Sequence, residues 1–165
     1  MKPFHLLVFI LLASCDPYDF EYKSEYQAIL MTRNQLEKSV VYQQPRAFIN
    51  TGKIYQKGYY IFINEKYKGV HIIDNHDPTS PQNIGFISAP GCIDMAVKGN
   101  SLYMDNALDL VAVDITNFEH VTVTERIKDV FPELLPPDSE GIPEEFTTSQ
   151  RPQNTIIVGW EKKAN

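Results

Sequence analysis

The chain contains only two cysteines in 165 residues, Cys15 and Cys92. Two thiols cannot supply the disulfide framework of the small cysteine-rich secreted folds. Basic residues are scarce as well, because 15 Lys and Arg stand against 21 Asp and Glu and give a formal charge of −6. Such a surface repels phosphate backbones and no basic cluster offsets it, so we expect no nucleic-acid partner.

Motifs that carry chemistry are missing too. The sequence has no Gly-x-Ser-x-Gly nucleophile turn, no phosphate-binding glycine loop, no dinucleotide fingerprint and no Asp-x-Asp-x-Asp-Gly calcium loop. We therefore expect no catalytic residues, no metal ligands and no cofactor, and we do not expect an enzyme. With 43% hydrophobic and 22% charged residues, the chain has the composition of one globular domain.

The start of the chain has the anatomy of a secretory signal. Lys2 precedes an apolar run over residues 4–12, about half the roughly 20 residues that a membrane-spanning helix needs. Residues 12–15, Leu-Ala-Ser-Cys, resemble the lipobox of bacterial lipoproteins. The resemblance implies that residues 1–14 are a cleaved signal peptide and that Cys15 is the lipidation site, with acyl chains that hold the protein on a membrane. The alternative is an ordinary secretory signal that happens to contain a cysteine.

Composition divides the rest of the chain into five segments. They are a lipidated tether (15–25), a strand and helix preamble (26–44), a repeat region (45–127), an acidic Pro-rich loop (128–154) and a C-terminal strand with a short tail (155–165). Proline cannot donate to a sheet ladder, so we expect the loop to be extended and mobile.

The preamble contains a helix-start signal. Thr32 and Gln35 are three residues apart, as a capping box requires, and predict a short helix through about Ser39. Before it, Tyr26 to Met31 is a candidate strand. At the other end of the chain, the strand from Thr155 either begins a missing third repeat or returns to cover a sheet edge.

The repeat region shows internal similarity at offsets of 41 and then 40 residues. Three pairs of segments keep their order: residues 57–64 with 98–105, 70–74 with 110–114, and 83–87 with 123–127. Each segment is a short β-branched and aromatic run between Gly, Asn, Asp and Pro, which is typical of strands joined by tight turns. With residues 94–97 placed first, each unit has four strands, the size of a β-propeller blade. The expected fold class is all-β.

The second repeat carries the sequence Leu110-Val111-Ala112-Val113-Asp114, which resembles the LVIVD repeat with one difference. The first copy, residues 69–74, is looser. LVIVD-repeat proteins are bacterial surface or periplasmic proteins, often lipoproteins of the Bacteroidota, and the resemblance implies propeller-like blades. Closed propellers have about four to eight blades. Two repeats therefore leave sheet edges open, which indicates a truncated chain, an assembly, or a sheet pair capped by the preamble.

Several polar groups are candidate site residues with an ordinary structural alternative. His71 and His76 flank Asp74 and lie near Asp77, but a strand histidine and a turn histidine need not converge on a metal, so we expect a surface histidine and an Asp-Pro turn. Asp74 recurs as Asp114, and a carboxylate at a strand end typically accepts backbone N–H bonds from the following turn.

Three further acids, Asp94, Asp105 and Asp109, are close in the second repeat. Paired carboxylates serve glycoside hydrolysis, but we expect these acids in a solvated loop. Cys92 has no basic neighbour to lower its pKa, so a small buried hydrophobe is expected. The crowded aromatics of the first repeat serve either core packing, which we favour, or ligand contact. They are Tyr55, Tyr59, Tyr60, Phe62 and Tyr67.

Together these features predict a binding or scaffold module in the bacterial cell envelope. The lipid on Cys15 would attach it to a membrane, which we expect to be the outer membrane, at the periplasmic side or the cell surface. Its partner would be a protein or a glycan that contacts loops at the rim. Two alternatives stay open, an envelope hydrolase or lyase built on a propeller, and a truncated fragment of a longer propeller lipoprotein.

Overall fold

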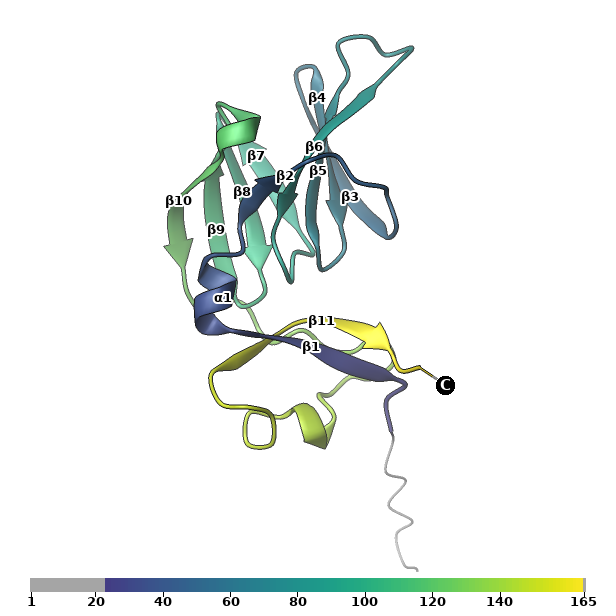
Figure 1. Ribbon diagram of the computed structural model, residues 1–165, viewed down its shortest axis with the longest axis vertical. Coiled ribbons are helices and arrows are strands. Elements are labelled where there is room, and N and C mark those ends of the chain that lie inside the picture. Colours follow the sequence, from purple (N-terminus) through teal and green to yellow (C-terminus); the bar gives the residue numbers. More distant parts are fainter. Residues whose placement is uncertain (1–22, 165) are drawn as a thin grey trace, which may run out of the picture.

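A computed structural model describes residues 23–164 of the chain (Figure 1). The predicted signal peptide and Cys15 lie outside the described residues. Of residues 23–164, 46% are in strands and 8% in helices, and the strands form three antiparallel sheets of which none closes on itself. The all-β prediction is therefore confirmed. Within residues 23–164, the helices are all too short or too polar to cross a membrane.

The first sheet has five strands in the order β2-β6-β5-β4-β3. Four of them are consecutive in the chain, and the fifth, β2, joins the outer side of β6. The bounds are β2 (Val41–Gln43), β3 (Thr51–Lys57), β4 (Tyr60–Glu65), β5 (Gly69–Asp74) and β6 (Gln82–Ser88). Strand β2 is not predictable from the sequence, because a three-residue strand carries too little periodicity.

The second sheet has four strands in the order β10-β9-β8-β7, all consecutive in the chain. Its bounds are β7 (Met95–Lys98), β8 (Ser101–Asn106), β9 (Asp109–Asp114) and β10 (Thr122–Ile127), with the 3-10 turn η1 (Phe118–His120) before β10. The two sheets lie next to each other (Figure 1) and share one apolar core. Phe62 and Ile72 of the first sheet and Leu102 and Val113 of the second are among its buried members.

The two sheets repeat each other in detail. Gly58 and Gly99 occupy the first turn of each sheet with φ of 59° and 60°, a left-handed conformation that favours glycine. In each last strand one residue is skipped by the pairing ladder, Ile84 in β6 and Thr124 in β10. Because a bulge is a specific local geometry, its recurrence 40 residues later indicates a structural repeat as well as a sequence repeat.

The third sheet pairs β1 (Tyr26–Thr32) with β11 (Thr155–Lys162) and lies beyond one end of the other two sheets (Figure 1). The C-terminal strand therefore returns to pair with the preamble strand and not with an edge of either repeat sheet. Helix α1 (Arg33–Glu37) follows β1, and both bonds of the Thr32–Gln35 capping box are present. The capping prediction is confirmed.

The acidic Pro-rich segment is folded onto β11, contrary to the expectation of a mobile loop. Leu134 is buried against Ile157 and Trp160, and the Trp160 indole donates to the Leu134 carbonyl at 2.9 Å. Phe146, in the 3-10 turn η2 (Glu144–Phe146), packs edge-on against the Trp160 ring. Apolar residues scattered among prolines thus supply enough burial to order the segment.

The described end of the predicted tether is docked as well. Ser24 donates to one carboxylate oxygen of Asp138 at 2.8 Å, and the Glu25 amide donates to the other at 2.7 Å. Ser24 and Glu25, at the end of the predicted tether, are therefore bound to the acidic loop, a partner that the local sequence does not reveal.

Candidate functional site

A groove of about 630 Å³ opens between the two larger sheets at the ends of their strands. Three turns line it: the β3–β4 turn, the β7–β8 turn and the connection from β9 to η1. The lining side chains and backbone come from Lys57, Gly58, Tyr59, Tyr60, Phe62, Asn100, Ile115, Thr116, Asn117 and Phe118. Two of these turns, β3–β4 and β7–β8, are equivalent in the two repeats, and the third comes from the second repeat alone.

Aromatic rings form a continuous row from solvent to the floor of the groove. Tyr59 is 62% exposed and stacks on His76, with ring centroids 4.5 Å apart and planes 23° from parallel. Tyr60 meets the edge of His76 at 5.5 Å and of Phe118 at 4.8 Å. Phe118 in turn lies 6.1 Å from Phe62, which is buried in the core. Packing fixes the inner rings and leaves the outer ones available for contact.

The His76 ring, on which Tyr59 stacks, is held in place by the turn that follows β5. The Asp74 carboxylate accepts a hydrogen bond from the His76 amide at 2.9 Å and also contacts the His76 ring. The His76 amide, then its ring, holds the pKa of Asp74 below the ordinary value. An ionised Asp74 therefore orients the ring on which Tyr59 stacks.

Amide and hydroxyl groups form the polar rim of the groove. The Asn100 amide donates to the Thr116 hydroxyl at 3.2 Å, and Asn117 accepts from the Glu119 amide at 3.0 Å to begin η1. Lys57 contacts the carbonyl oxygen of Gly99. The groove combines flat apolar rings with neutral donors and acceptors, which suits binding of an uncharged, partly apolar ligand.

The predicted structural role of the strand-end acids is confirmed. Asp114 accepts hydrogen bonds from the Thr116 amide at 2.8 Å and from its hydroxyl at 2.6 Å, as Asp74 does from His76. The hydroxyl, then the amide, lowers the pKa of Asp114. The two acids therefore brace equivalent turns.

The two histidines do not share a site, and His71 is not at the surface as expected. Its ring is fully buried, and its Nε2 lies 3.2 Å from Glu65, a buried carboxylate. His76 is 54% exposed and contacts Asp74 instead. Among residues 23–164, no group of three or more His, Cys, Asp or Glu side chains could hold a metal.

Burial and hydrogen bonding act in opposite directions on the pKa values of the buried pair His71 and Glu65. Burial lowers the pKa of His71 more than the Glu65 carboxylate raises it. Burial alone would raise the pKa of Glu65, but N–H bonds from Asn50 and Ile49, together with His71, hold it below the usual value. The pair is therefore a neutral imidazole donating to a carboxylate, and the unpaired His71 Nδ1 is consistent with that tautomer.

The three acids of the second repeat do not converge. Asp94 and Asp105 line one cavity of about 210 Å³, which Asp109 does not line. Asp105 accepts hydrogen bonds from the Ile93 and Asp94 amides at 2.9 and 2.8 Å, and burial raises its pKa. Asp94 pairs with Lys53. Each carboxylate is thus occupied by contacts within the chain.

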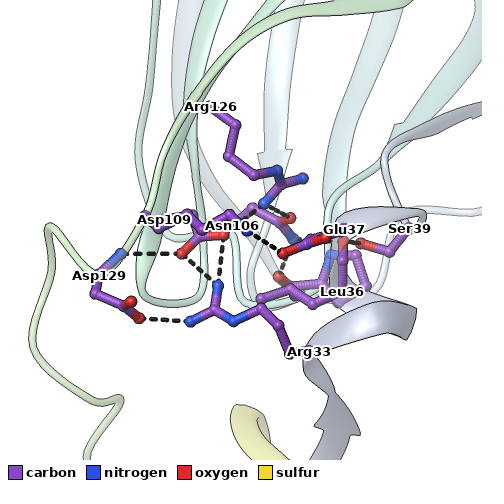
Figure 2. A network of polar contacts seen from close by, with 10 residues as sticks. Arg33, Leu36, Glu37, Ser39, Asn106, Asp109, Arg126 and Asp129 are labelled. Atoms are coloured by element: carbon purple, nitrogen blue, oxygen red, sulfur yellow. Dashed lines mark hydrogen bonds and ion pairs between the residues drawn. The ribbon is translucent and has the colours of Figure 1, made fainter.

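Asp109 is buried, which corrects the expectation of a solvated loop for this acid. Figure 2 shows its carboxylate between Arg33 of α1 and Arg126 of β10. Burial alone would raise the pKa of Asp109, but the hydrogen bonds from the two arginines and from the Asp129 amide hold it low. The network joins the preamble to the second sheet.

The prediction for Cys92 is confirmed, because its side chain is fully buried. Burial, and after it the nearby Asp105, raises the pKa of the thiol well above its usual value. The Asn64 amide donates to the sulfur at 3.2 Å. An uncharged thiol in this place has the role of a small core side chain.

No family model, curated protein or solved structure matches this chain. The groove itself was only partly visible in the sequence. Tyr59 and Tyr60 belong to the aromatic cluster that the sequence indicates, whereas Asn117 and Phe118 carry no local signal of a site. Their role depends on η1 turning toward the other sheet, which no local pattern specifies.

Proposed function

We propose that this chain is a lipid-anchored protein of the bacterial cell envelope that binds an oligosaccharide in the aromatic groove. The anchor would be acyl chains on Cys15, in the outer membrane at the periplasmic side or the cell surface. Its two larger sheets would be consecutive propeller-like blades of the LVIVD type. The protein would be a binding or scaffold module and not an enzyme.

The observation that carries the binding proposal is the exposed Tyr59 ring stacked on His76. Sugar rings present flat arrays of C–H bonds that pack on aromatic faces, while their hydroxyls both donate and accept. Asn100, Thr116 and Asn117 supply groups of both kinds at the rim. A charged ligand is less suited, because Lys57 is the one formally charged residue in the lining and it contacts Gly99.

Two features support the blade interpretation. Four consecutive antiparallel strands recur in each sheet, and the bulges recur at equivalent positions. Binding at turns between neighbouring sheets is also common for proteins whose rigid strands position variable loops.

Isothermal titration calorimetry of the detergent-solubilised protein tests the binding proposal. The probes are soluble chito-oligosaccharides, β-glucan and α-mannan oligosaccharides. We expect at least one of them to bind, with an affinity reduced by about fivefold in Tyr59→Ala, because a stacked aromatic contributes about 1 kcal/mol. Tyr103→Ala, on another face of the molecule, is the matched control and leaves the affinity unchanged.

Two results would contradict this function. The first is no heat of binding with any of the three probe classes. The second is binding that Tyr59→Ala and Tyr103→Ala alter equally, since a ligand outside the groove would not distinguish them.

A further inference from the structure

Each of the two larger sheets has an outer face, turned away from the other sheet, that exposes apolar side chains. On the first sheet Ile54 is 67% exposed, and Ile61 and Ile63 are half-buried. On the second sheet Tyr103 is 37% and Ile127 is 51% exposed. Exposed apolar surface on two faces of one small protein indicates contact sites.

The repeat register relates these outer faces to the interface already buried inside the chain. In the second sheet the pair Leu102–Val113 faces the core, and its counterpart in the first sheet is the pair Ile61–Ile73 on the outer face. The outer face of the first sheet, where Ile61 is half-buried and Ile73 is buried, is therefore the counterpart of a face that packs in the core in the second.

The opposite correspondence holds for the second sheet. The pair Phe62–Ile72 of the first sheet faces the core, and its counterpart is the pair Tyr103–Ala112 on the outer face of the second sheet. The two exposed faces thus correspond, one to one, to the two faces that pack together within the chain.

The segments that precede the two sheets show the same correspondence between a buried position in one repeat and an outer position in the other. The Asn106 amide donates to the Pro90 carbonyl at 2.7 Å, and its counterpart Glu65 accepts from the Ile49 amide at 3.2 Å. Ala89, just before Pro90, is buried between the sheets. Its counterpart Phe48 is 47% exposed on the outer face of the first sheet, 4.3 Å from the His71 ring.

Polar contacts between β3 and β7 would also be reproduced between copies. Lys53 pairs with Asp94, and these two residues are also each other's counterparts in the two repeats. Between copies, Asp94 of one copy would therefore face Lys53 of the next. Both side chains keep more than half their surface exposed, at 62% and 55%. Likewise the Lys57 contact with the Gly99 carbonyl becomes Lys98 with the Gly58 carbonyl, so both residue types are retained.

We propose that copies of this chain associate head to tail, with the outer face of the second sheet of one copy packed on the outer face of the first sheet of the next. The contact repeats the interface between the sheets of one chain. Such a heterologous interface closes into a ring or grows into a filament. Because closed propellers have about four to eight sheets, a closed ring would contain about two to four copies.

Site-directed cross-linking in cells that express the full-length chain tests this geometry. The Tyr55 hydroxyl donates to the Val97 carbonyl at 3.0 Å, so these two residues are in contact across the interface between the sheets. The counterpart of Tyr55 is Ala96 and that of Val97 is Gln56, so Ala96 of one copy would lie close to Gln56 of the next. One tagged copy carries Gln56→Cys and a differently tagged copy carries Ala96→Cys. Since these positions lie on opposite outer faces of a chain, a link between them joins two copies.

Under oxidation, or with a short bis-maleimide, we expect a linked dimer that carries both tags, and no self-linked dimer of either variant alone. Adding Ile54→Lys to the Gln56→Cys copy should reduce the yield about tenfold or more, because it buries an unpaired charge. Ile127→Lys in the Ala96→Cys copy tests the same contact from the other side. Leu135→Lys, at a residue 46% exposed elsewhere, is the matched control and leaves the yield unchanged.

Three outcomes would overturn the assembly: no mixed dimer, self-linking of either single variant, which means a two-fold dimer, or links only to a different protein. The circular dichroism spectrum of each purified variant in detergent establishes that the fold is retained. The oligosaccharide titration does not depend on this interface, so failure of one proposal leaves the other standing.

Discussion

Arg33 donates to both carboxylate oxygens of Asp109, at 2.7 and 2.8 Å, and so ties helix α1 to strand β9 across 76 residues of sequence. Arg126 reaches the same carboxylate at 2.7 Å from β10 (Figure 2). The carboxylate is fully buried, whereas the Arg33 side chain is 28% exposed. The third sheet is therefore held to the second sheet by charge pairing as well as by apolar packing.

Asp109→Ala should destabilise the protein by about 3 to 5 kcal/mol, because Arg126 loses its carboxylate partner in a buried site and Arg33 keeps only the exposed Asp129. Urea denaturation followed by circular dichroism measures the change. Asp129→Ala is the matched control, since Asp129 also pairs with Arg33 but is 63% exposed. It should cost under about 1 kcal/mol. Equal losses in the two variants would show that the buried network has no special role.

The buried His71 predicts a dependence of stability on pH. Its pKa is lower in the folded protein than the ordinary value of about 6.5, mainly through burial. Below that pH the unfolded chain binds a proton that the folded chain resists, so stability is fully present above about pH 6.5 and falls as the pH decreases toward the folded pKa.

His71→Gln tests this dependence, because the glutamine amide can still donate to Glu65 but does not titrate. Urea midpoints measured from pH 7.5 to 5 should fall more steeply for the wild type than for the variant. Parallel curves would mean that His71 binds its proton equally well in the folded and unfolded states, which contradicts the lowered pKa.

Cys92 should be inert in the folded protein. Its buried, uncharged thiol cannot reach a reagent in water, because the thiolate is the reactive form. We expect no reaction with Ellman's reagent under native conditions and one equivalent of Cys92 thiol after denaturation in guanidinium. Fast reaction in the native state would contradict the burial.

Much of the fold was predictable because it depends on local signals. Gly58 and Gly99 mark tight turns, and apolar runs between such turns predict strands in a fixed order. The Thr32–Gln35 capping box is also local and was found. These features need only a few neighbouring residues to be specified.

What could not be predicted depends on contacts between distant segments. Pairing of β1 with β11 joins the two ends of the described chain, and neither strand specifies its partner. Asp109 is buried against Arg33, and His71 is buried against Glu65 and Phe48. These partners are distant in the sequence, so the local sequence predicts exposure for both side chains. The groove was missed for the same reason, since Phe118 reaches Tyr60 from the other sheet.

Metabolic labelling with a clickable fatty acid tests most directly the claim that this protein is anchored in a bacterial envelope. The full-length wild type and Cys15→Ser are expressed side by side, and Cys92→Ser is the matched control. We predict that label appears in the wild type and in Cys92→Ser, co-sediments with membranes, and is absent from Cys15→Ser. Equal labelling of all three proteins, or none in the wild type, would contradict the account.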